Sequence, residues 1–294
     1  MSDMHFTGEV YRHPIEAETP LLQVTVGCSH NKCSFCTMYR NTPFGISPQD
    51  HIDEDLQELK ATGRKITRIF LVNGEPFVLS TARLIEIGEK INKYFPEIEA
   101  ITCYTSIQNL KKKSVEELKQ LRVLNFNQLH IGLESADDEA LAIMNKGFTS
   151  EEAYENLEKL KQAGIEWDAI IMTGVAGKGR GVEHIEKTAK LINTYPPYLI
   201  SLMTTSVSSG SELEQYRNEG RFVECTEREK IEEEKLLLEL VNVKDAYFFG
   251  SHYYNLIPVS GSLEHKDAII EYIDRKMEQI DDSILDSIKP RANI

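Results

Sequence analysis

Short apolar runs alternate along the chain with longer segments in which apolar residues recur at helical spacing. The runs that predict strands are residues 21–27, 68–74, 100–106, 127–135, 165–174 and 198–206. Between them, apolar residues recur three or four positions apart, which places them on one face of a helix. These stripes are Leu84, Ile87 and Ile91, then Ala153, Leu157 and Leu160, and then Val182, Ile185 and Ile192. We interpret all of them as core-facing.

Helix-end signals agree with these stripes. Ser114 with Glu117, and Thr149 with Glu152, have the spacing of capping boxes, and Gly164 stands where a helix would end. Regular alternation of strand and helix predicts parallel strands, because parallel neighbours need a crossover connection. The expected fold class is α/β, a partial (β/α)6 barrel similar to a TIM barrel. Its site should lie at the carboxyl ends of the strands.

The pattern changes after residue 206. Helices are predicted near residues 211–219, 226–242 and 264–280, and the last two flank an aromatic stretch punctuated by proline and glycine. We interpret this part as a C-terminal helical cap. The sequence has no internal repeat or linker, so residues 1–294 are expected to form one domain, with a barrel core at about 15–210 and the cap at about 211–294.

Composition and charge narrow the class of partner. The 294 residues are 41% hydrophobic, enough for a large core, and carry a formal net charge of -14. An acidic chain has no overall field to attract a nucleic acid polymer, so a small-molecule substrate is expected. The first twenty residues lack the pattern of a secretory signal, and no apolar run is long enough to cross a membrane. We therefore expect a cytoplasmic protein with no membrane partner.

Three of the five cysteines lie together directly after the first predicted strand. Cys28, Cys33 and Cys36 have the spacing C-x4-C-x2-C. A structural zinc site needs four ligands, and only one Cys-x2-Cys pair is present; His30 is a less favourable candidate for the fourth ligand. Three thiolates from one loop suit a [4Fe-4S] cluster whose fourth iron is open to another ligand. Cys103 and Cys225 have no cysteine nearby and are expected to be buried bystanders.

This cysteine loop resembles that of the radical S-adenosylmethionine (SAM) superfamily, over roughly residues 15–210. The resemblance implies a cluster held by the three cysteines, with SAM bound to the open iron and cleaved reductively to a 5'-deoxyadenosyl radical. It also implies an external electron donor such as flavodoxin or ferredoxin. Most of the superfamily has C-x3-C-x2-C, so the first gap here is longer by one residue.

The resemblance extends to residues expected to bind SAM. Phe35 matches an aromatic position that packs on the adenine. "NGEP" at 73–76 matches a motif that binds the amine, through Gly74 and Glu75. "GLES" at 132–135 and "TGVAGKGRG" at 173–181 end later strands, which implies further SAM contacts from the residues Glu134, Ser135 and Gly174. Taken singly, Glu75 and Glu134 could instead be carboxylates placed at helix starts.

Substrate contacts are expected from polar residues at the rim of the barrel. Lys178, Arg180 and Arg12 are candidates to bind a phosphate, although such charges are more often solvated. His252 and Asn255 lie in the aromatic stretch, where packing is the alternative to substrate contact, and Tyr39 follows the cysteine loop.

The cysteine motif indicates how the reaction starts, by reductive cleavage of SAM, but does not predict the product. The chain lacks a second cysteine cluster and a recognisable RNA-binding appendage. Its build resembles short stand-alone radical SAM proteins labelled like oxygen-independent coproporphyrinogen oxidases. Among characterised activities it resembles queuosine lyase, which releases queuine for salvage from a nucleoside or nucleotide. The alternatives are a porphyrin-type or other small-molecule oxidoreductase, and a non-catalytic zinc or iron-sulfur binding protein.

Overall fold

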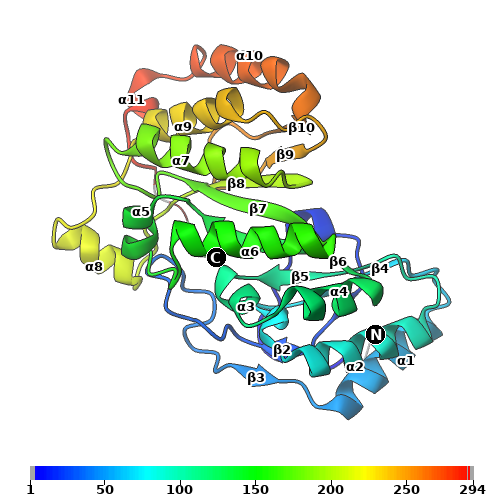
Figure 1. Ribbon diagram of the computed structural model, residues 1–294. Helices are drawn as coiled ribbons and strands as arrows, with labels where there is room; N and C mark the ends of the chain where they lie inside the picture. The colour runs from blue at the N-terminus through cyan, green and yellow to red at the C-terminus, as the bar shows by residue number, and fades with distance from the viewer. Residues whose placement is uncertain (1–3, 290, 292–294) are drawn as a thin grey trace. The chain divides into compact units, whose positions relative to one another are not determined.

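The computed structural model describes residues 4–289 and 291 (Figure 1). The described chain forms two compact units. The first consists of residues 4–31, 39–132 and 155–167, and the second of residues 32–38, 133–154, 168–289 and 291. The predicted single domain includes residues 1–3, 290 and 292–294, which lie outside the described residues, and it stays a prediction.

The first unit is built on parallel strands. These strands are β1 (Leu21–Leu22), β4 (Arg68–Leu71), β5 (Ala100–Thr105) and most of β6 (Phe126–Glu134). β4 pairs in parallel with β1 and with β5, and β5 pairs in parallel with β6. A separate antiparallel pair consists of β2 (Thr25–Val26) and β3 (Gly45–Ile46), one on each side of the cysteine segment in the sequence.

Helices connect these strands. They are α1 (Gln49–Ala61), α2 (Thr81–Tyr94), α3 (Ile107–Lys111), α4 (Val115–Val123) and the larger part of α6 (Ser150–Ala163), with the 3-10 turns η1 (Pro14–Glu16) and η2 (Pro76–Val78). α2 contacts both α1 and α4 (Figure 1). Because the strands are parallel, the segments that follow β4 and β5 leave the sheet at the same edge.

The second unit continues the alternation. Its strands are most of β7 (Glu166–Thr173), β8 (Leu199–Thr204), β9 (Tyr247–Gly250) and β10 (Val259–Ser262). β8 pairs in parallel with β7 and with β9, whereas β10 is antiparallel to β9. The helices are α5 (Asp138–Ile143), α7 (Gly181–Thr194), α8 (Glu212–Asn218), α9 (Glu227–Leu240), α10 (Lys266–Met277) and α11 (Asp282–Leu285), with the 3-10 turn η3 (Leu263–His265). α9 contacts α7 and α10 (Figure 1).

All six predicted strands and the three predicted C-terminal helices are present. The aromatic stretch contains β9 and β10, which the sequence did not predict, because proline and glycine interrupt the strand pattern there. The first predicted strand is also divided, since β2 separates from β1 to pair with β3. Both capping boxes form, and Gly164 ends α6 with φ +69°.

The predicted helical stripes are buried, with one exception. Leu84, Ile87 and Ile91 are fully buried, as are Ile185 and Ile192. Val182 was expected to face the core, and this prediction is wrong, because its side chain is 62% exposed. It lies in the first turn of α7, before the buried face of that helix begins.

A buried carboxylate connects the segment before β1 to three strands of the first unit. Glu16 ends η1 and accepts hydrogen bonds from Arg68 Nε and Nη2, at 2.9 and 2.6 Å. The Thr19 and Thr102 hydroxyls donate to the same carboxylate at 2.6 and 3.0 Å, and His130 Nε2 lies 3.0 Å from it. Because Arg68, Thr102 and His130 belong to β4, β5 and β6, one side chain ties η1 to all three strands.

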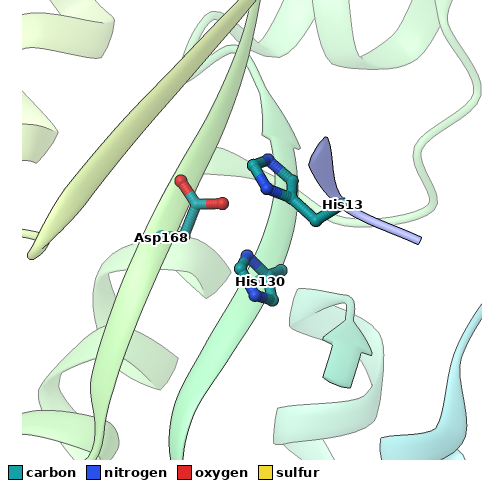
Figure 2. Close-up of side chains that lie close together, drawn as sticks. All are labelled: His13, His130 and Asp168. Atoms are coloured by element: carbon teal, nitrogen blue, oxygen red, sulfur yellow. The ribbon is translucent and has the colours of Figure 1, made fainter. Parts of the chain in front are cut away.

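Aromatic rings pack around His130, one of the partners of Glu16. The imidazoles of His13 and His130 stack, with centroids 4.6 Å apart and an interplanar angle of 15° (Figure 2). Phe70 and Tyr104 meet His130 edge-on at 5.7 and 5.9 Å. This packing keeps water from the carboxylate, which strengthens each of its hydrogen bonds.

The environment of Glu16 makes its charge a source of stability. Burial alone would raise the pKa of the Glu16 carboxyl, but the hydrogen bonds from His130 and Arg68 and the charge of Arg68 outweigh burial and lower that pKa. A lowered folded-state pKa contributes stability that is present above the unfolded pKa, about 4.3 for Glu, and is lost as the pH falls below it.

Within the part of the chain that the structure describes, every helix is too short or too polar to traverse a bilayer.

We expect Glu16→Gln to lower the free energy of unfolding at pH 7 by about 3–5 kcal/mol, the usual effect of breaking a buried ion pair. Urea denaturation followed by circular dichroism measures this difference. Below about pH 4, the difference in the free energy of unfolding between the variant and the wild type should become smaller. At that pH the wild type begins to lose the stability that the ionised Glu16 carboxylate contributes. Glu18→Gln, at an exposed neighbouring position, is the control and should change stability little. Equal stability of the Glu16→Gln variant and the wild type would contradict this account.

Candidate active site

In the first unit, the end of β4 lies directly against Cys28. The Gly74 N–H donates to the Gly27 carbonyl at 3.3 Å. A Cβ at position 74 would lie 2.8 Å from the Cys28 Cβ and 3.0 Å from its Cα, closer than real Cβ atoms approach. Asn73 precedes this contact with φ +77°, and its amide donates to the Thr25 carbonyl at 3.2 Å. Glycine at position 74 is therefore required by the position of Cys28.

The Glu75 carboxylate holds the loop that begins at Cys28. Its Oε2 accepts a hydrogen bond from the Ser29 hydroxyl and another from the His30 backbone N–H, the latter at 3.2 Å. Its Oε1 accepts none from the residues that the structure describes. The side chain is nearly buried, at 6% exposure. One carboxylate oxygen is thus used by the loop, while the other remains available to a cation.

Further contacts in the first unit restrain the same loop. The His30 imidazole Nδ1 lies 3.2 Å from the Gln108 amide, which follows β5. The Asn31 side chain donates to the Tyr39 carbonyl at 2.8 Å, and its backbone N–H lies 3.4 Å from Cys28 Sγ. The Tyr39 ring, predicted to contact substrate, is 5% exposed and packs edge-on against another tyrosine.

In the second unit, the segment with Cys33 and Cys36 is bound to the end of α5. The Ser34 N–H donates to the Met144 carbonyl at 3.0 Å, and its hydroxyl donates to the Ile143 carbonyl at 2.8 Å. The Ser34 carbonyl accepts from the N–H of Leu213 in α8 at 2.8 Å. All three loop cysteines are partly exposed, as reactive cysteines commonly are. Cys103 and Cys225 are buried, as expected.

Glu134 and Lys146 form a buried ion pair in the second unit. Lys146 Nζ lies 3.1 Å from Glu134 Oε1, and each side chain is 8% exposed. Glu134 has φ +63°, a conformation that costs a residue with a side chain about 1–2 kcal/mol. Its Oε2 is buried without a hydrogen-bond partner among the described residues. The Lys146 ammonium also lies 5.9 Å from the centroid of the Phe35 ring. Strain and an unsatisfied oxygen together are typical of a binding site.

Ser135, the neighbour of Glu134, is used within the fold. His184 Nε2 lies 3.2 Å from the Met172 carbonyl, which only accepts, so Nε2 carries the proton. Burial lowers the pKa of His184 to about 4, so the ring is neutral and its Nδ1 accepts from the Ser135 hydroxyl at 2.8 Å. The Ser135 oxygen also accepts the Asp137 N–H at 2.9 Å.

The loop after β7 is fixed by α9. Gly174 has φ +73°, and its N–H donates to Glu233 Oε2 at 2.6 Å. A Cβ at Gly174 would lie 3.2 Å from the Lys230 side chain. Burial raises the pKa of the Glu233 carboxyl to about 7. Gly174 therefore lies in a tight turn held by a carboxyl that titrates near neutrality.

The two cations predicted in this loop differ in their availability. Lys178 has an exposed side chain, while its backbone N–H donates to the Val223 carbonyl at 2.9 Å. Arg180 forms ion pairs with Asp137 at 2.9 Å and Glu139 at 2.7 Å. A phosphate bound by Arg180 would have to compete with these carboxylates.

Asn255 and His252 also make internal contacts. The Asn255 Oδ1 accepts from the Thr204 hydroxyl at 2.9 Å, and its amide donates to the Leu202 and Gly250 carbonyls at 2.9 and 2.7 Å. Burial, and then the charge of Arg291, lower the pKa of His252 to about 4, so this imidazole is neutral at pH 7.

Arg12 lies near the amino end of β1. Its exposed side chain lines a cavity of about 260 Å³ together with Leu21, Arg64 and residues of the preceding segment. Cys28 lies farther along the chain, after β2. The predicted phosphate contact from Arg12 stays a prediction.

Three residues of this arrangement had no clear signal in the sequence. Ser29 is an ordinary loop serine, and only its contact with Glu75 distinguishes it. Lys146 follows α5, where a cation is common because it complements the helix dipole. Glu233 is one of several glutamates in α9, and its burial depends on the packing of that helix.

Comparison with known proteins matches residues 22–192, more than half of the chain, to the radical SAM superfamily. The tRNA uridine(34) acetyltransferase of Methanocaldococcus infernus is 23% identical over 257 residues, which cover 70% of this chain and 46% of that protein. The heme chaperone HemW of Lactococcus lactis is 25% identical over 140 residues, covering 47% of this chain and 36% of that protein. The chain thus spans less than half the length of these curated relatives.

Solved structures show the same fold. Methylornithine synthase (PylB) has a TM-score of 0.56 and 16% identity, covering 89% of this chain and 81% of that one. The archaeal Methanocaldococcus infernus Elp3 has a TM-score of 0.54 and 17% identity, covering 90% and 64%. These likenesses confirm the predicted α/β partial-barrel fold class. Because the family match covers more than half of the chain and includes Cys28, Cys33 and Cys36, the chain belongs to the radical SAM superfamily.

Proposed function

We propose that this radical SAM enzyme binds its [4Fe-4S] cluster through Cys28, Cys33 and Cys36 and the SAM amine through Glu75. When bound, the cluster and SAM supply a reductive cleavage that yields a 5'-deoxyadenosyl radical able to remove a hydrogen atom from a substrate. The observation that carries the proposal is the divided use of the Glu75 carboxylate, in which one oxygen holds the Cys28 loop and the other is open.

The Glu75 carboxylate uses one oxygen to hold the loop and leaves the other open, which suits a ligand with an ammonium group. A carboxylate in a nearly buried position needs a compensating charge or hydrogen bonds. Ser29 and His30 satisfy Oε2, so the open Oε1 favours a cation with several N–H donors. In this role Glu75 both orients the SAM amine and links it to the loop that carries Cys28.

Glu134, Lys146 and Phe35 are also proposed to contact SAM. The Lys146 ammonium is held by Glu134 and brings a positive charge to this place, which suits a ligand carboxylate. The unpaired Glu134 Oε2 suits a ribose hydroxyl. Phe35 is proposed to pack against the adenine. Gly174 is proposed to approach SAM through its backbone, in a turn that Glu233 holds.

Ser135, Tyr39 and Asn255 fit a supporting role better than direct contact. Each is nearly buried, and Ser135 and Asn255 use their polar groups on neighbouring parts of the fold. Lys178 and His252 keep their proposed substrate role, since the Lys178 side chain is exposed and the His252 imidazole is neutral. Arg180 can bind a substrate phosphate only when that phosphate displaces its acidic partners. Arg12 can bind one only when the phosphate enters the cavity beside it.

The narrower hypothesis for the substrate is queuosine or its 5'-phosphate, cleaved to release queuine. Its support is the similarity of build to short stand-alone radical SAM proteins; the described contacts do not single out this nucleoside. Relatives that modify tRNA make a polymeric RNA substrate the second candidate, although the net charge of -14 opposes it. A porphyrin-type substrate would need several free cations, whereas Arg180 is already paired.

Gly74→Ala is expected to reduce cluster retention. The added Cβ would meet the Cys28 backbone and Cβ, so Cys28 must move, and a displaced ligand binds iron less well. We expect iron per protein after anaerobic reconstitution to fall by about half or more, as is typical when a site loses the support around its ligands. Gly45→Ala is the control, because its Cβ would come no closer than 4.0 Å to its nearest neighbour. Equal iron content in both variants would contradict the proposed constraint.

Glu75→Gln is expected to weaken SAM binding while the cluster is retained. The glutamine oxygen can still accept from Ser29 and His30, but its NH2 group then faces the position proposed for the SAM ammonium. Loss of a charge-assisted hydrogen bond corresponds to about a 10- to 100-fold weaker Kd. Titration of SAM into the reduced enzyme, followed by electron paramagnetic resonance, measures this Kd, with Glu89→Gln at an exposed position as the control. An unchanged Kd would remove Glu75 from the SAM site.

The reaction is tested with cluster-loaded enzyme, SAM and dithionite. We expect slow formation of 5'-deoxyadenosine that the substrate stimulates. Queuosine 5'-phosphate and unfractionated tRNA are compared as substrates, and release of queuine is measured in each. Stimulation by the nucleotide with release of queuine supports the narrower hypothesis, and stimulation by tRNA alone replaces it. If no 5'-deoxyadenosine forms under any of these conditions, the proposed function is wrong.

A further inference from the structure

The first unit has a cavity of about 260 Å³ beside the start of β1. We call it the amino-edge cavity. Its lining comes from the N-terminal segment, through Met4 and Phe6, from residues 12 and 17–21, and from Arg64 in the loop between α1 and β4. Pockets for drug-sized ligands measure roughly 300–1,000 Å³, so the cavity suits a small molecule that stays partly in solvent.

The wall that carries Phe6 is held in place on both sides of that residue. The His5 backbone N–H donates to Asp55 Oδ1 at 2.9 Å, and the His5 imidazole Nδ1 lies at the same distance from that oxygen. The Thr7 N–H donates to Gln23 Oε1 at 3.0 Å. The N-terminal segment is thus attached to α1 and to the residue after β1, so the cavity has walls without a ligand.

The charged groups in the cavity have no partners of their own. The Arg12 and Arg64 side chains are exposed, and neither guanidinium forms a hydrogen bond or an ion pair with the described residues. The Glu18 carboxylate lines the same cavity and pairs with neither of them. Two guanidinium groups and one carboxylate are therefore available to a ligand. Guanidinium groups favour phosphate and carboxylate, because their fork of N–H donors matches two anionic oxygens.

The cavity also offers an apolar surface. Phe6 is 39% exposed although it is aromatic, and Met4 and Leu21 lie beside it in the lining. An aromatic ring that is open to solvent on a fixed segment can stack against a planar ring of a ligand, as in the recognition of unpaired bases. The lining thus fits a molecule with an anionic end and a flat apolar body.

The cavity lies at the opposite edge of the sheet from the thiol of Cys28. Leu21 begins β1, which is parallel to β4, and Arg64 precedes β4, so both residues are at the amino ends of these strands. Gly74, which approaches Cys28, follows the carboxyl end of β4. The four residues of β4 alone span roughly 10 Å, at about 3.3 Å per residue. A ligand in the cavity is therefore bound apart from Cys28.

We propose that the amino-edge cavity is a second ligand site, which binds a nucleoside 5'-monophosphate. A phosphate monoester carries about -1.5 to -2 charges at pH 7, which matches the two guanidinium groups of Arg12 and Arg64. The ribose hydroxyls can donate to Glu18, and the base can pack on Phe6. The inference goes beyond the proposed function and does not depend on it, since neither the cysteines nor Glu75 line the cavity.

The test is calorimetric titration of AMP into the cluster-loaded, full-length protein. SAM is kept saturating and no reductant is added, so the adenine position of SAM is occupied and no turnover occurs. Adenosine, ribose 5-phosphate and inorganic phosphate are titrated in parallel. The variants are Arg12→Gln and Arg64→Gln. Lys65→Gln is the matched control, because it removes the same charge from an exposed neighbour outside the cavity lining.

We expect the wild type to bind AMP more tightly than the three partial ligands. Each arginine variant should bind AMP about 10- to 100-fold more weakly, the effect of losing a charge-assisted hydrogen bond, while Lys65→Gln should match the wild type. Phe6→Ala should lower the affinity for AMP to near that for ribose 5-phosphate, because the base then has no ring to stack on. Circular dichroism checks that all variants fold.

Several results would overturn the proposal. These are the absence of AMP binding to the wild type, equal affinity for AMP and adenosine, unchanged affinity in both arginine variants, and the same loss in Lys65→Gln. Equal affinity for AMP and inorganic phosphate would make the cavity a site for a simple anion and reject the nucleotide. The proposed function is judged separately, because these titrations contain no reductant and do not depend on the formation of 5'-deoxyadenosine.

Discussion

The close approach of Gly74 to Cys28 is the constraint on which the candidate site depends. Parallel pairing of β1 and β4 brings the segments after both strands to one edge, but the ladder alone does not place a thiol. The Gly74 N–H bond to Gly27 and the absence of a side chain at 74 let the two backbones meet. Glu75 then receives two donors from the residues after Cys28. The turn at Gly74 thus positions both Cys28, the proposed cluster ligand, and the Glu75 carboxylate, which is proposed to face SAM.

The Glu16 network makes a different use of buried charge. Every hydrogen-bonding partner of Glu16 comes from within the first unit, and two of its contacts are with one guanidinium. This carboxylate is satisfied, so its charge stabilises the fold. Glu134 also pairs with a cation, yet it keeps a buried oxygen without a partner and a left-handed backbone. Comparing the two separates a structural carboxylate from one that is proposed to bind a ligand.

The six strands, the helix ends and the cysteine motif were predictable because each depends on local spacing. Capping at Ser114 and Thr149, and the buried stripe of Leu84, Ile87 and Ile91, follow from neighbours within a turn or two. The missed features are those that packing decides. β9 and β10 form because the chain finds a place beside β8, although proline and glycine interrupt the pattern. The role of Lys146 depends on the position of Glu134, twelve residues earlier.

The longer first gap in the cysteine motif acquires a meaning from the contacts of Glu75. Ser29 and His30, two of the four residues in that gap, are the donors that hold Oε2. His30 also extends toward Gln108, so the loop is tied to the segments after both β4 and β5. To bind zinc through Nδ1, the His30 imidazole would have to give up its contact with Gln108. Ser29 and His30 therefore attach the residues after Cys28 to the segments that follow β4 and β5.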